Sequence, residues 1–334
     1  MRIKRTDLVK QAKLVTMQKI LLLGGTGFVG SHLCEKLAEV PCRVTVLTRR
    51  RENARHLQLL PTVDIAEVRS LDSAVLAPLL AEHDAVVNLI AILHGNETTF
   101  EKAHVNLPLE LARACEAVGQ QRIVHVSALG ASLEAPSMYL RSKARGEAVL
   151  LGSGLDVSVL RPSVIFGAED KFLNTFAMLQ KMFPVIPLAG SGARFQPVWV
   201  EDVADAIVKC LQDKATIGQI YEACGPEIFT LRQLVEMAGR YSGVNGGAGR
   251  PVFGLPDALA RLQAWFMELA PGEPMMSRDN LDSMKTDNIA SGKLPGLEAL
   301  GIHPTALAAI APFYLGAQGL RSGLTAKRKT AGRF

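Results

Sequence analysis

Aromatic side chains are scarce in this chain of 334 residues: they make up 5% of it, so its core must be built mostly from aliphatic side chains. Cysteine is scarce as well, with five residues at scattered positions and no C-x-x-C pair. An odd cysteine count without paired spacing argues against a secreted disulfide scaffold and favours a reducing compartment. The seven histidines show no metal-ligand spacing either. We therefore predict no metal site.

Long apolar runs are also missing. No uninterrupted run reaches the ~20 residues of a membrane-spanning helix. The N-terminus is basic but lacks the apolar segment of a signal peptide. Met17 directly precedes the first predicted strand, so we interpret residues 1–16 as a basic extension and Met17 as a candidate start. These features predict a cytoplasmic protein.

The net charge of +5 is concentrated at the two ends of the chain. Residues 1–19 hold six basic residues against one acidic residue, and residues 321–334 hold five basic residues and no acidic one, which leaves a net charge of −5 between them. A basic surface across the fold is therefore absent, which argues against a nucleic-acid partner. The basic tail follows residues 299–320, which contain no charged side chain, so we expect peripheral contact with the inner face of an anionic membrane.

The overall composition, with 48% hydrophobic and 21% charged residues, is that of a globular protein of about two domains. Short apolar runs alternate with helical patterns, of which the clearest is 107–118. This alternation predicts an α/β fold with a doubly wound parallel sheet. The predicted strands are 19–23, 43–47, 85–90, 122–126 and 156–160.

The pattern changes after residue 165. The second half has few strand signals and helical patterns at 202–211, 231–241 and 257–269. It predicts a smaller, mainly helical lobe over residues 166–320, interleaved with the last strands of the sheet. We expect Asp202 to cap the first of these helices. The apolar stripe of Leu259, Leu262, Phe266 and Leu269 predicts a buried helix face, or alternatively a lid over an apolar substrate or a membrane.

Three glycines spaced as G-x-x-G-x-x-G separate the first strand from the first helix. Such a turn lets the backbone approach a pyrophosphate, and the following helix offers free N–H groups to it. In this context the motif predicts a nucleotide site in residues 17–165; the alternative is a glycine turn used only for close packing. The predicted cofactor-binding residues here are Gly24, Thr26, Gly27, Phe28, Val29 and Gly30.

The second strand ends in Thr48, Arg49 and Arg50, followed by Arg51, with no acidic residue. An NAD site needs a carboxylate at this place for the ribose 2′-hydroxyl, whereas arginines pair with a 2′-phosphate. We therefore predict NADP(H) in preference to NAD(H). The alternative is a solvated basic turn.

Tyr139 and Lys143 lie four residues apart on one predicted helix face, and Ser127 follows the strand 122–126. An ammonium group beside a phenol lowers the phenol pKa, which suits acid–base catalysis. Spacing alone is also compatible with a surface pair. The position downstream of the glycine turn favours a catalytic group.

Taken together, these motifs resemble the extended and atypical short-chain dehydrogenase/reductase superfamily, with its NAD-dependent epimerase/dehydratase-like members. The branch most similar to the chain is that of the Rossmann-type accessory subunit of respiratory complex I and its bacterial relatives. The similarity covers residues 17–315. The segments that carry it are 24–30, 88–91, 139–147, 161–167, 166–174, 196–204 and 286–288.

The resemblance implies a role for each matching residue. Ser127 and Tyr139 would hold a substrate carbonyl or hydroxyl, Lys143 would bond the nicotinamide ribose, and Asn106 would help position Lys143 through water. The loop formed by Asn88, Leu89, Ile90 and Ala91 would run beside the adenine ribose, and Pro162, Ser163 and Val164 would pass near the nicotinamide.

Some positions depart from the family pattern. Leu23 precedes the first glycine where many members have Ser or Thr, and Glu67 stands about where an Asp usually meets the adenine. Phe166 stands where sugar-modifying relatives carry Tyr, and Ile90 interrupts their alanine-rich turn. These differences disfavour a nucleotide-sugar epimerase or reductase, which we keep as a third hypothesis.

The leading hypothesis is an NADP(H)-dependent oxidoreductase acting on a carbonyl or hydroxyl of an apolar small molecule related to quinones or isoprenoids. The second hypothesis is a non-catalytic NADP(H)-binding subunit of a respiratory or quinone-biosynthetic complex. The Tyr139/Lys143 pair favours the enzyme, because a purely structural subunit does not need it.

Overall fold

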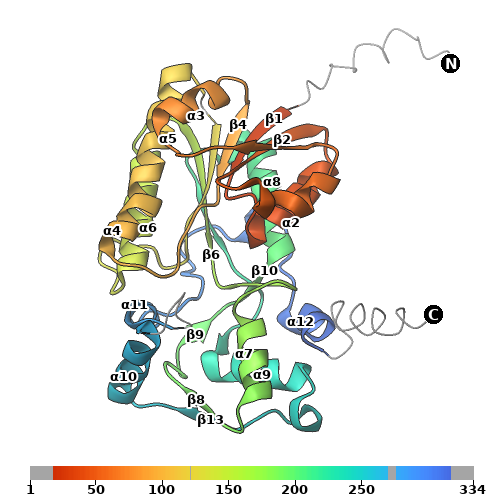
Figure 1. Cartoon of the computed structure of the whole chain (residues 1–334), viewed down its shortest axis with the longest axis vertical. Coiled ribbons are helices and arrows are strands. Elements are labelled where there is room, and N and C mark those ends of the chain that lie inside the picture. The colour runs from red at the N-terminus through yellow and green to blue at the C-terminus, as the bar shows by residue number, and fades with distance from the viewer. Residues whose placement is uncertain (1–17, 121, 270–275, 317–334) are drawn as a thin grey trace, which may run out of the picture.

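A computed structural model describes residues 18–120, 122–269 and 276–316 (Figure 1). The predicted N-terminal extension and the basic tail from residue 321 lie outside the described residues. Figure 1 shows a layered α/β part above a smaller lobe that contains α7, α9 and α10.

The α/β part is built on a sheet of seven parallel strands in the order β11-β6-β5-β4-β1-β2-β3. The order reverses between β1 and β4, where ligands of doubly wound sheets bind. This sheet confirms the predicted fold class. Its strands are β1 (Gln18–Leu23), β2 (Cys42–Thr48), β3 (Val63–Glu67), β4 (Ala85–Asn88), β5 (Arg122–Val126), β6 (Asp156–Pro162) and β11 (Ile220–Ala223).

Helices cover both faces of the sheet. One face packs on α2 and α8, the other on α3, α5 and α6, and alternate residues of β1 enter the two cores: Ile20 and Leu22 on one side, Leu21 and Leu23 on the other. A strand buried on both faces explains the unbroken apolar run. The elements are α2 (Phe28–Ala38), η1 (Arg51–Leu59), α3 (Ser73–Leu80), α4 (Glu97–Glu101), the π-helical η2 (Lys102–Asn106), α5 (Leu107–Val118), α6 (Met138–Leu151), α8 (Val200–Gln212) and η3 (Lys214–Thr216).

The smaller lobe has two apolar clusters of its own, formed largely by α7, α9 and α12. Its strands are short and paired: β7 (Ile165–Phe166) with β10 (Val198–Trp199), β8 (Ile186–Leu188) with β13 (Val252–Gly254), and β9 (Arg194–Phe195) with β12 (Phe229–Thr230). Its helices are α7 (Leu173–Met182), α9 (Leu231–Tyr241), η4 (Val244–Gly247), α10 (Asp257–Glu268), α11 (Arg278–Ser283), η5 (Leu297–Leu300) and α12 (Leu307–Leu315). Between α7 and α9 the chain returns to the large sheet through α8 and β11.

Two expectations about this half are wrong. Asp202 does not cap α8, which begins at Val200; its carboxylate accepts the N–H of Thr305 at 2.7 Å and so ties the C-terminal segment to α8. The apolar stripe of α10 is not a core face. Ala260 and Ala264 are buried instead, while Leu259, Leu262, Phe266 and Leu269 are 48–63% exposed. Small residues face the protein, so the large ones point outward.

Candidate functional site: the glycine turn, Tyr139 and Lys143

The glycine turn brings the ends of β1 and β4 together. Gly24 has a φ of +82°, which favours glycine, and a Cβ there would lie 3.1 Å from the carbonyl carbon of Leu89. At Gly30 a Cβ would lie 2.5 Å from the Cα of Gly25, so α2 packs on the turn only without a side chain. Gly27 is exposed, and a Cβ there would meet only the carbonyl oxygen of Gly24, at 3.3 Å. The turn therefore leaves open space around Gly27. We call the turn of residues 24–30 together with this space the cradle.

The N-terminus of α2 completes the cradle. Gly27 is its N-cap, no side chain caps it, and its first turn has no acidic residue. Thr26, Phe28 and Val29 are half-buried around it. Uncapped N–H groups at the positive end of a helix favour an anion such as a pyrophosphate. The residues present therefore fit a dinucleotide.

Exposed arginines follow β2 beside this cradle. The buried Thr48 hydroxyl donates to the carbonyl oxygen of Arg50 at 2.9 Å, which fixes the turn. Arg49 and Arg50 are exposed, and neither forms an ion pair with any residue in the described ranges. Glu67 accepts the backbone N–H of Arg51 at 3.3 Å. Two guanidinium groups are thus available to an anionic ligand.

His56 was not predicted from the sequence. Its Nε2 lies 2.8 Å from the hydroxyl oxygen of Ser31, which itself donates to the carbonyl oxygen of Gly27 at 2.8 Å. Since the serine hydrogen points at Gly27, Nε2 is the donor. The bond connects η1, which follows the arginines, to the first turn of α2.

The buried side chain of Asn88 fixes the loop after β4. Asn88 is fully buried; its side-chain oxygen accepts the N–H of Ile90 at 3.1 Å, and its amide nitrogen lies 3.3 Å from Nδ1 of His125. Leu89 and Ile90 are half-buried and Ala91 is exposed. Asn88 thus shapes the predicted ribose loop from the interior.

Lys143 and Ser127 lie together at the end of β5. Lys143 is 1% exposed, and its Nζ donates to the carbonyl oxygen of Val126 at 2.8 Å. Burial lowers the pKa of this amine to about 8, while Glu147 one turn further on opposes the shift. The hydroxyl oxygen of Ser127 is buried without a hydrogen-bond partner among the described residues. A buried unpaired hydroxyl is costly unless a ligand satisfies it.

Tyr139 packs on the apolar cluster that contains Ala128, the residue after Ser127. No hydrogen bond within the described ranges reaches its hydroxyl. Burial raises the pKa of the phenol to about 12, which contradicts the expectation that Lys143 lowers it. The Lys143 amine is engaged by the Val126 carbonyl, so burial dominates. The structure therefore has Tyr139 as a neutral phenol, the proton-donating form.

A buried histidine, His104, packs against Tyr139. The His104 ring lies edge-on to the Tyr139 ring at 5.5 Å, and its Nε2 accepts the N–H of Ile92 at 3.1 Å. Its Nδ1 lies 2.8 Å from the hydroxyl oxygen of Ser142, which donates to the Tyr139 carbonyl oxygen. Nε2 must accept, so Nδ1 carries the hydrogen and the ring is neutral; burial lowers the His104 pKa to about 3.

His104 lies in the π-helical turn η2, and such turns are frequent at functional sites. Asn106, at the end of the same turn, is exposed. Among the described residues no hydrogen bond joins it directly to Lys143, so its role in positioning Lys143 through water stays a prediction. His104, in the same turn, is buried.

The segment after β6 is held by the C-terminal part of the chain. Pro162 and Ser163 are buried and Val164 is half-buried. The Ser163 hydroxyl donates to the side-chain oxygen of Asn288 at 2.6 Å, and the N–H of Val164 donates to the same oxygen at 3.1 Å. Asn288 was signalled only as part of the 286–288 motif.

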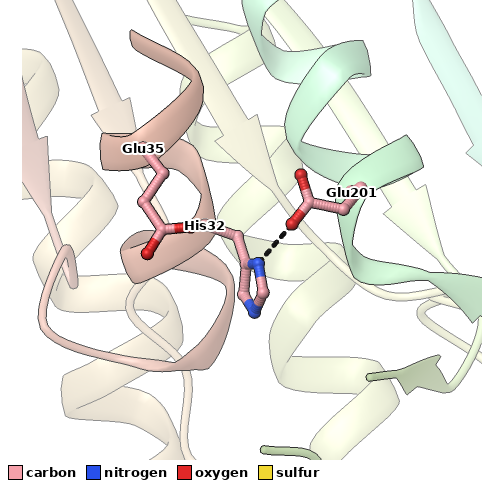
Figure 2. Close-up of side chains that lie close together, drawn as sticks. All are labelled: His32, Glu35 and Glu201. Carbon is pink, nitrogen blue, oxygen red and sulfur yellow. Dashed lines mark hydrogen bonds and ion pairs between the residues drawn. The ribbon is translucent and has the colours of Figure 1, made fainter. Parts of the chain in front are cut away.

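An ion-pair network joins α2 to α8 near the cradle. Figure 2 shows His32 between Glu35, on its own helix, and Glu201. Nδ1 of His32 lies 2.5 Å from Glu201, and the Lys36 ammonium lies 3.3 Å from the same carboxylate. The ligand atoms of His32, Glu35 and Glu201 lie within 4.8 Å of one another, a spacing that a metal ion tolerates. Because Lys36 already neutralises Glu201, we assign the group to ion pairing.

Replacement of His32 with glutamine is expected to destabilise the protein more at pH 5.5 than at pH 8.5, by about 1 kcal/mol. The Glu201 hydrogen bond raises the His32 pKa above 6.5, so this stabilisation is complete below pH 6.5 and is lost as the pH rises through the raised value. The Glu201 pKa is lowered below 4.5 by the same bond, so its share is lost only in stronger acid. Thermal unfolding of wild type and variant at the two pH values measures the loss of stability that the substitution causes. An equal loss at both pH values would contradict the ion pair.

Within the described residues, no helix combines the length and the apolar character that crossing a bilayer requires.

Known proteins resemble the chain over most of its length. A mitochondrial relative from Mus musculus, NADH dehydrogenase [ubiquinone] 1 alpha subcomplex subunit 9, is 31% identical over 86% of this chain and 76% of its own length. The protein of the same name from Arabidopsis thaliana is 36% identical over 65% of this chain, and the match spans 56% of that relative. These matches confirm the predicted likeness to the accessory subunit of respiratory complex I.

Solved structures share the fold at low sequence identity. An NADPH-dependent quinone oxidoreductase from Escherichia coli matches with a TM-score of 0.66 at 20% identity, over 87% of this chain and 97% of that one. A nucleoside-diphosphate-sugar epimerase from Staphylococcus aureus matches with a TM-score of 0.69 at 14% identity, over 87% and 98%. The model of the NAD dependent epimerase/dehydratase family matches residues 20–224, which run from β1 past β11 and contain the cradle, Ser127, Tyr139 and Lys143. The chain is therefore a member of the NAD dependent epimerase/dehydratase family.

Proposed function

We propose that the protein binds NADP(H) at the glycine turn, where the ends of β1 and β4 meet, and serves as an NADP(H)-binding subunit of a respiratory complex. The observation that carries the cofactor assignment is the pair of exposed arginines without ion-pair partners in the described chain, placed where an NAD site has a carboxylate. The association rests on the subunit 9 relatives. The residues that would hold the cofactor are Gly24, Thr26, Gly27, Phe28, Val29, Gly30, Thr48, Arg49, Arg50, Asn88, Leu89, Ile90, Ala91, Lys143, Pro162, Ser163 and Val164.

Replacement of both Arg49 and Arg50 with alanine is expected to weaken NADPH binding by about 10- to 100-fold, because the charge-assisted hydrogen bonding that this exposed pair gives the 2′-phosphate contributes about 1.5–3 kcal/mol in total. NADH binding should change by less than about threefold, since NADH has no 2′-phosphate. The matched control is Arg43→Ala, which removes an exposed arginine from the opposite end of β2. Isothermal titration with both nucleotides measures these affinities. The assignment is overturned if the protein binds NADH more tightly than NADPH and the Arg49/Arg50 double variant binds both nucleotides like wild type.

The exposed stripe of α10 is the surface we propose for the partner complex. Its large residues face outward and the charges beside it are paired within the protein, as in Arg261–Asp282. Leu262→Glu with Phe266→Glu is expected to abolish co-migration with respiratory complexes on native gels, whereas Gln263→Glu should not. Unchanged co-migration of the double variant excludes this face.

We also propose a peripheral position at the cytoplasmic face of the membrane. The support is sequence-based: the basic tail follows an uncharged segment. Flotation with anionic liposomes tests it by comparing the full chain with one that lacks residues 321–334. Equal recovery of both proteins contradicts the role of the tail.

A second candidate is an oxidoreductase acting on a carbonyl or hydroxyl of an apolar, quinone- or isoprenoid-related molecule. It is favoured by the Ser127 hydroxyl near Tyr139 and Lys143, which has no hydrogen-bond partner in the part of the chain that the structure describes. When bound, NADPH supplies the hydride. Ser127 would donate a hydrogen bond to the substrate oxygen, and Tyr139, protonated at neutral pH, would deliver the proton to it. Lys143 would bond the cofactor ribose.

A further inference from the structure

We propose that Asp279, from α11 of the smaller lobe, is a positioning residue that sets the place of Tyr139. Its Oδ1 accepts the N–H of Met138 at 2.6 Å and its Oδ2 accepts the N–H of Tyr139 at 3.1 Å. These contacts bridge 141 and 140 positions of the chain. The inference rests on the proposed oxidoreductase site and adds to it a residue from the other lobe.

The first turn of α6 shows why this carboxylate matters. The N–H groups at a helix start have no partner inside the helix. Ser137, the N-cap, supplies its side chain to the N–H of Leu140 at 3.2 Å and its carbonyl oxygen to the N–H of Arg141. The N–H groups of Met138 and Tyr139 remain, and Asp279 accepts both. A carboxylate at this helix end is also favoured by the helix dipole.

Asp279 is itself held in place. It is 8% exposed, and the helix α11 begins with a capping box between Ser277 and Asn280. The Asn280 amide also donates to the carbonyl oxygen of Leu93 at 3.4 Å, in the segment after β4. Figure 1 shows α11 below α6 and α4, at the junction of the two parts. The short helix therefore contacts both sides of the predicted site.

Ion pairs join α11 to α10. Arg278 pairs with Glu268 at 2.8 Å, and Arg261 pairs with Asp282 at 2.9 Å. The two helices form one unit. Within these two helices Asp279 has the one buried carboxylate, and it accepts the backbone N–H of Tyr139. Seating of this unit and placement of the tyrosine are consequently coupled.

The test measures the ionisation of Tyr139 in the full chain by phenolate absorbance. In Asp279→Ala, two N–H groups lose their acceptor, the first turn of α6 opens to water, and the pKa of Tyr139 should fall from about 12 toward 10. At pH 10.5 this variant should gain the absorbance of up to about 0.7 of one phenolate, and the gain should vanish when Tyr139→Phe is added. The other three tyrosines, Tyr221, Tyr241 and Tyr314, are present in every variant, so the absorbance is compared as the difference from wild type.

Asp257→Ala is the matched control: it removes an exposed carboxylate from the start of α10 that forms no ion pair within the described residues, and it should leave the titration unchanged. Asp279→Asn keeps one acceptor oxygen and should lie between wild type and alanine; it decides the question if the alanine variant does not fold. Identical Tyr139 titration in wild type and the foldable Asp279 variants overturns the proposal.

Cofactor binding separates this proposal from the function on which it rests. NADPH affinity should stay within about threefold in Asp279→Asn, while any turnover by the wild type should fall by about 10- to 100-fold through kcat. A wild type that binds no NADPH defeats the proposed function, yet the titration still decides whether Asp279 positions Tyr139. A loss of NADPH affinity equal to the loss of turnover indicates a general structural role and contradicts the proposal.

Discussion

Alanine in place of Gly30 is expected to weaken NADPH binding by about 100-fold or more, which corresponds to roughly 2.8 kcal/mol. The added Cβ would lie 2.5 Å from the Cα of Gly25 and 2.6 Å from the carbonyl oxygen of Gly24. Both are backbone atoms, so no side-chain rotation relieves the contact. The helix must move away from the turn, which separates its N–H groups from the cradle and also lowers stability by about 1–3 kcal/mol.

Two further glycines make this prediction specific. Gly27→Ala should reduce NADPH affinity with little loss of stability, because its Cβ meets only one atom, at 3.3 Å, and occupies the exposed middle of the cradle. Gly192→Ala is the control, since nothing lies within 4 Å of its Cβ. Titration with NADPH and thermal unfolding distinguish the three. Wild-type affinity in the Gly30 variant would falsify the location of the cofactor.

The sheet could be predicted because its strands are buried on both faces. The sequence of such a strand is a short apolar run. Strand β5, for example, begins and ends where the predicted run 122–126 does. Strand β3 was missed, since only Val63 of its five residues is buried and its polar residues mask the pattern. Strand β11 was missed because its place in the sheet depends on a return from the other lobe.

The glycine turn was predictable for a local reason: strand, turn and helix are adjacent in sequence. The contacts that sequence reasoning missed join residues far apart in the chain. Asp279 reaches Tyr139 across 140 positions and Asn288 reaches Ser163 across 125. Neither lies in a local pattern that specifies its partner. His104 was overlooked because the π-helical turn shifts the register by which helix faces are counted.

The pKa of Tyr139 could not be inferred from spacing either. Four residues on a helix place the phenol and the ammonium on one face, but they do not say where the ammonium bonds. Lys143 bonds the Val126 carbonyl, and burial of the phenol is the larger effect. For α10, the spacing of Leu259, Leu262, Phe266 and Leu269 predicts an apolar face but not which side of it meets the protein.

Phenylalanine in place of Tyr139 is expected to abolish turnover, by about 10³-fold, while NADPH affinity stays within about threefold. The substitution removes only the hydroxyl, which has no partner in the described chain, and leaves the ring contacts with Phe100 and His104. Purified protein is incubated with NADPH and a panel of quinones and hydroxylated precursors, and cofactor oxidation is followed. Tyr241→Phe, a change at the end of α9, is the control.

The pH dependence of turnover adds an independent check. Lys143 has a pKa lowered to about 8 by burial, so its charge is present below pH 8 and is lost above it, whereas Tyr139 stays protonated up to about 12. A reduction that needs the proton of Tyr139 and the charge of Lys143 should therefore slow as the pH rises through 8. If wild type binds NADPH but turns over no substrate at any pH, the hydroxyls of Ser127 and Tyr139 are not a catalytic pair. The chain's role is then that of a subunit that holds the cofactor, and the arginines after β2, not the tyrosine, are the residues whose loss should impair it.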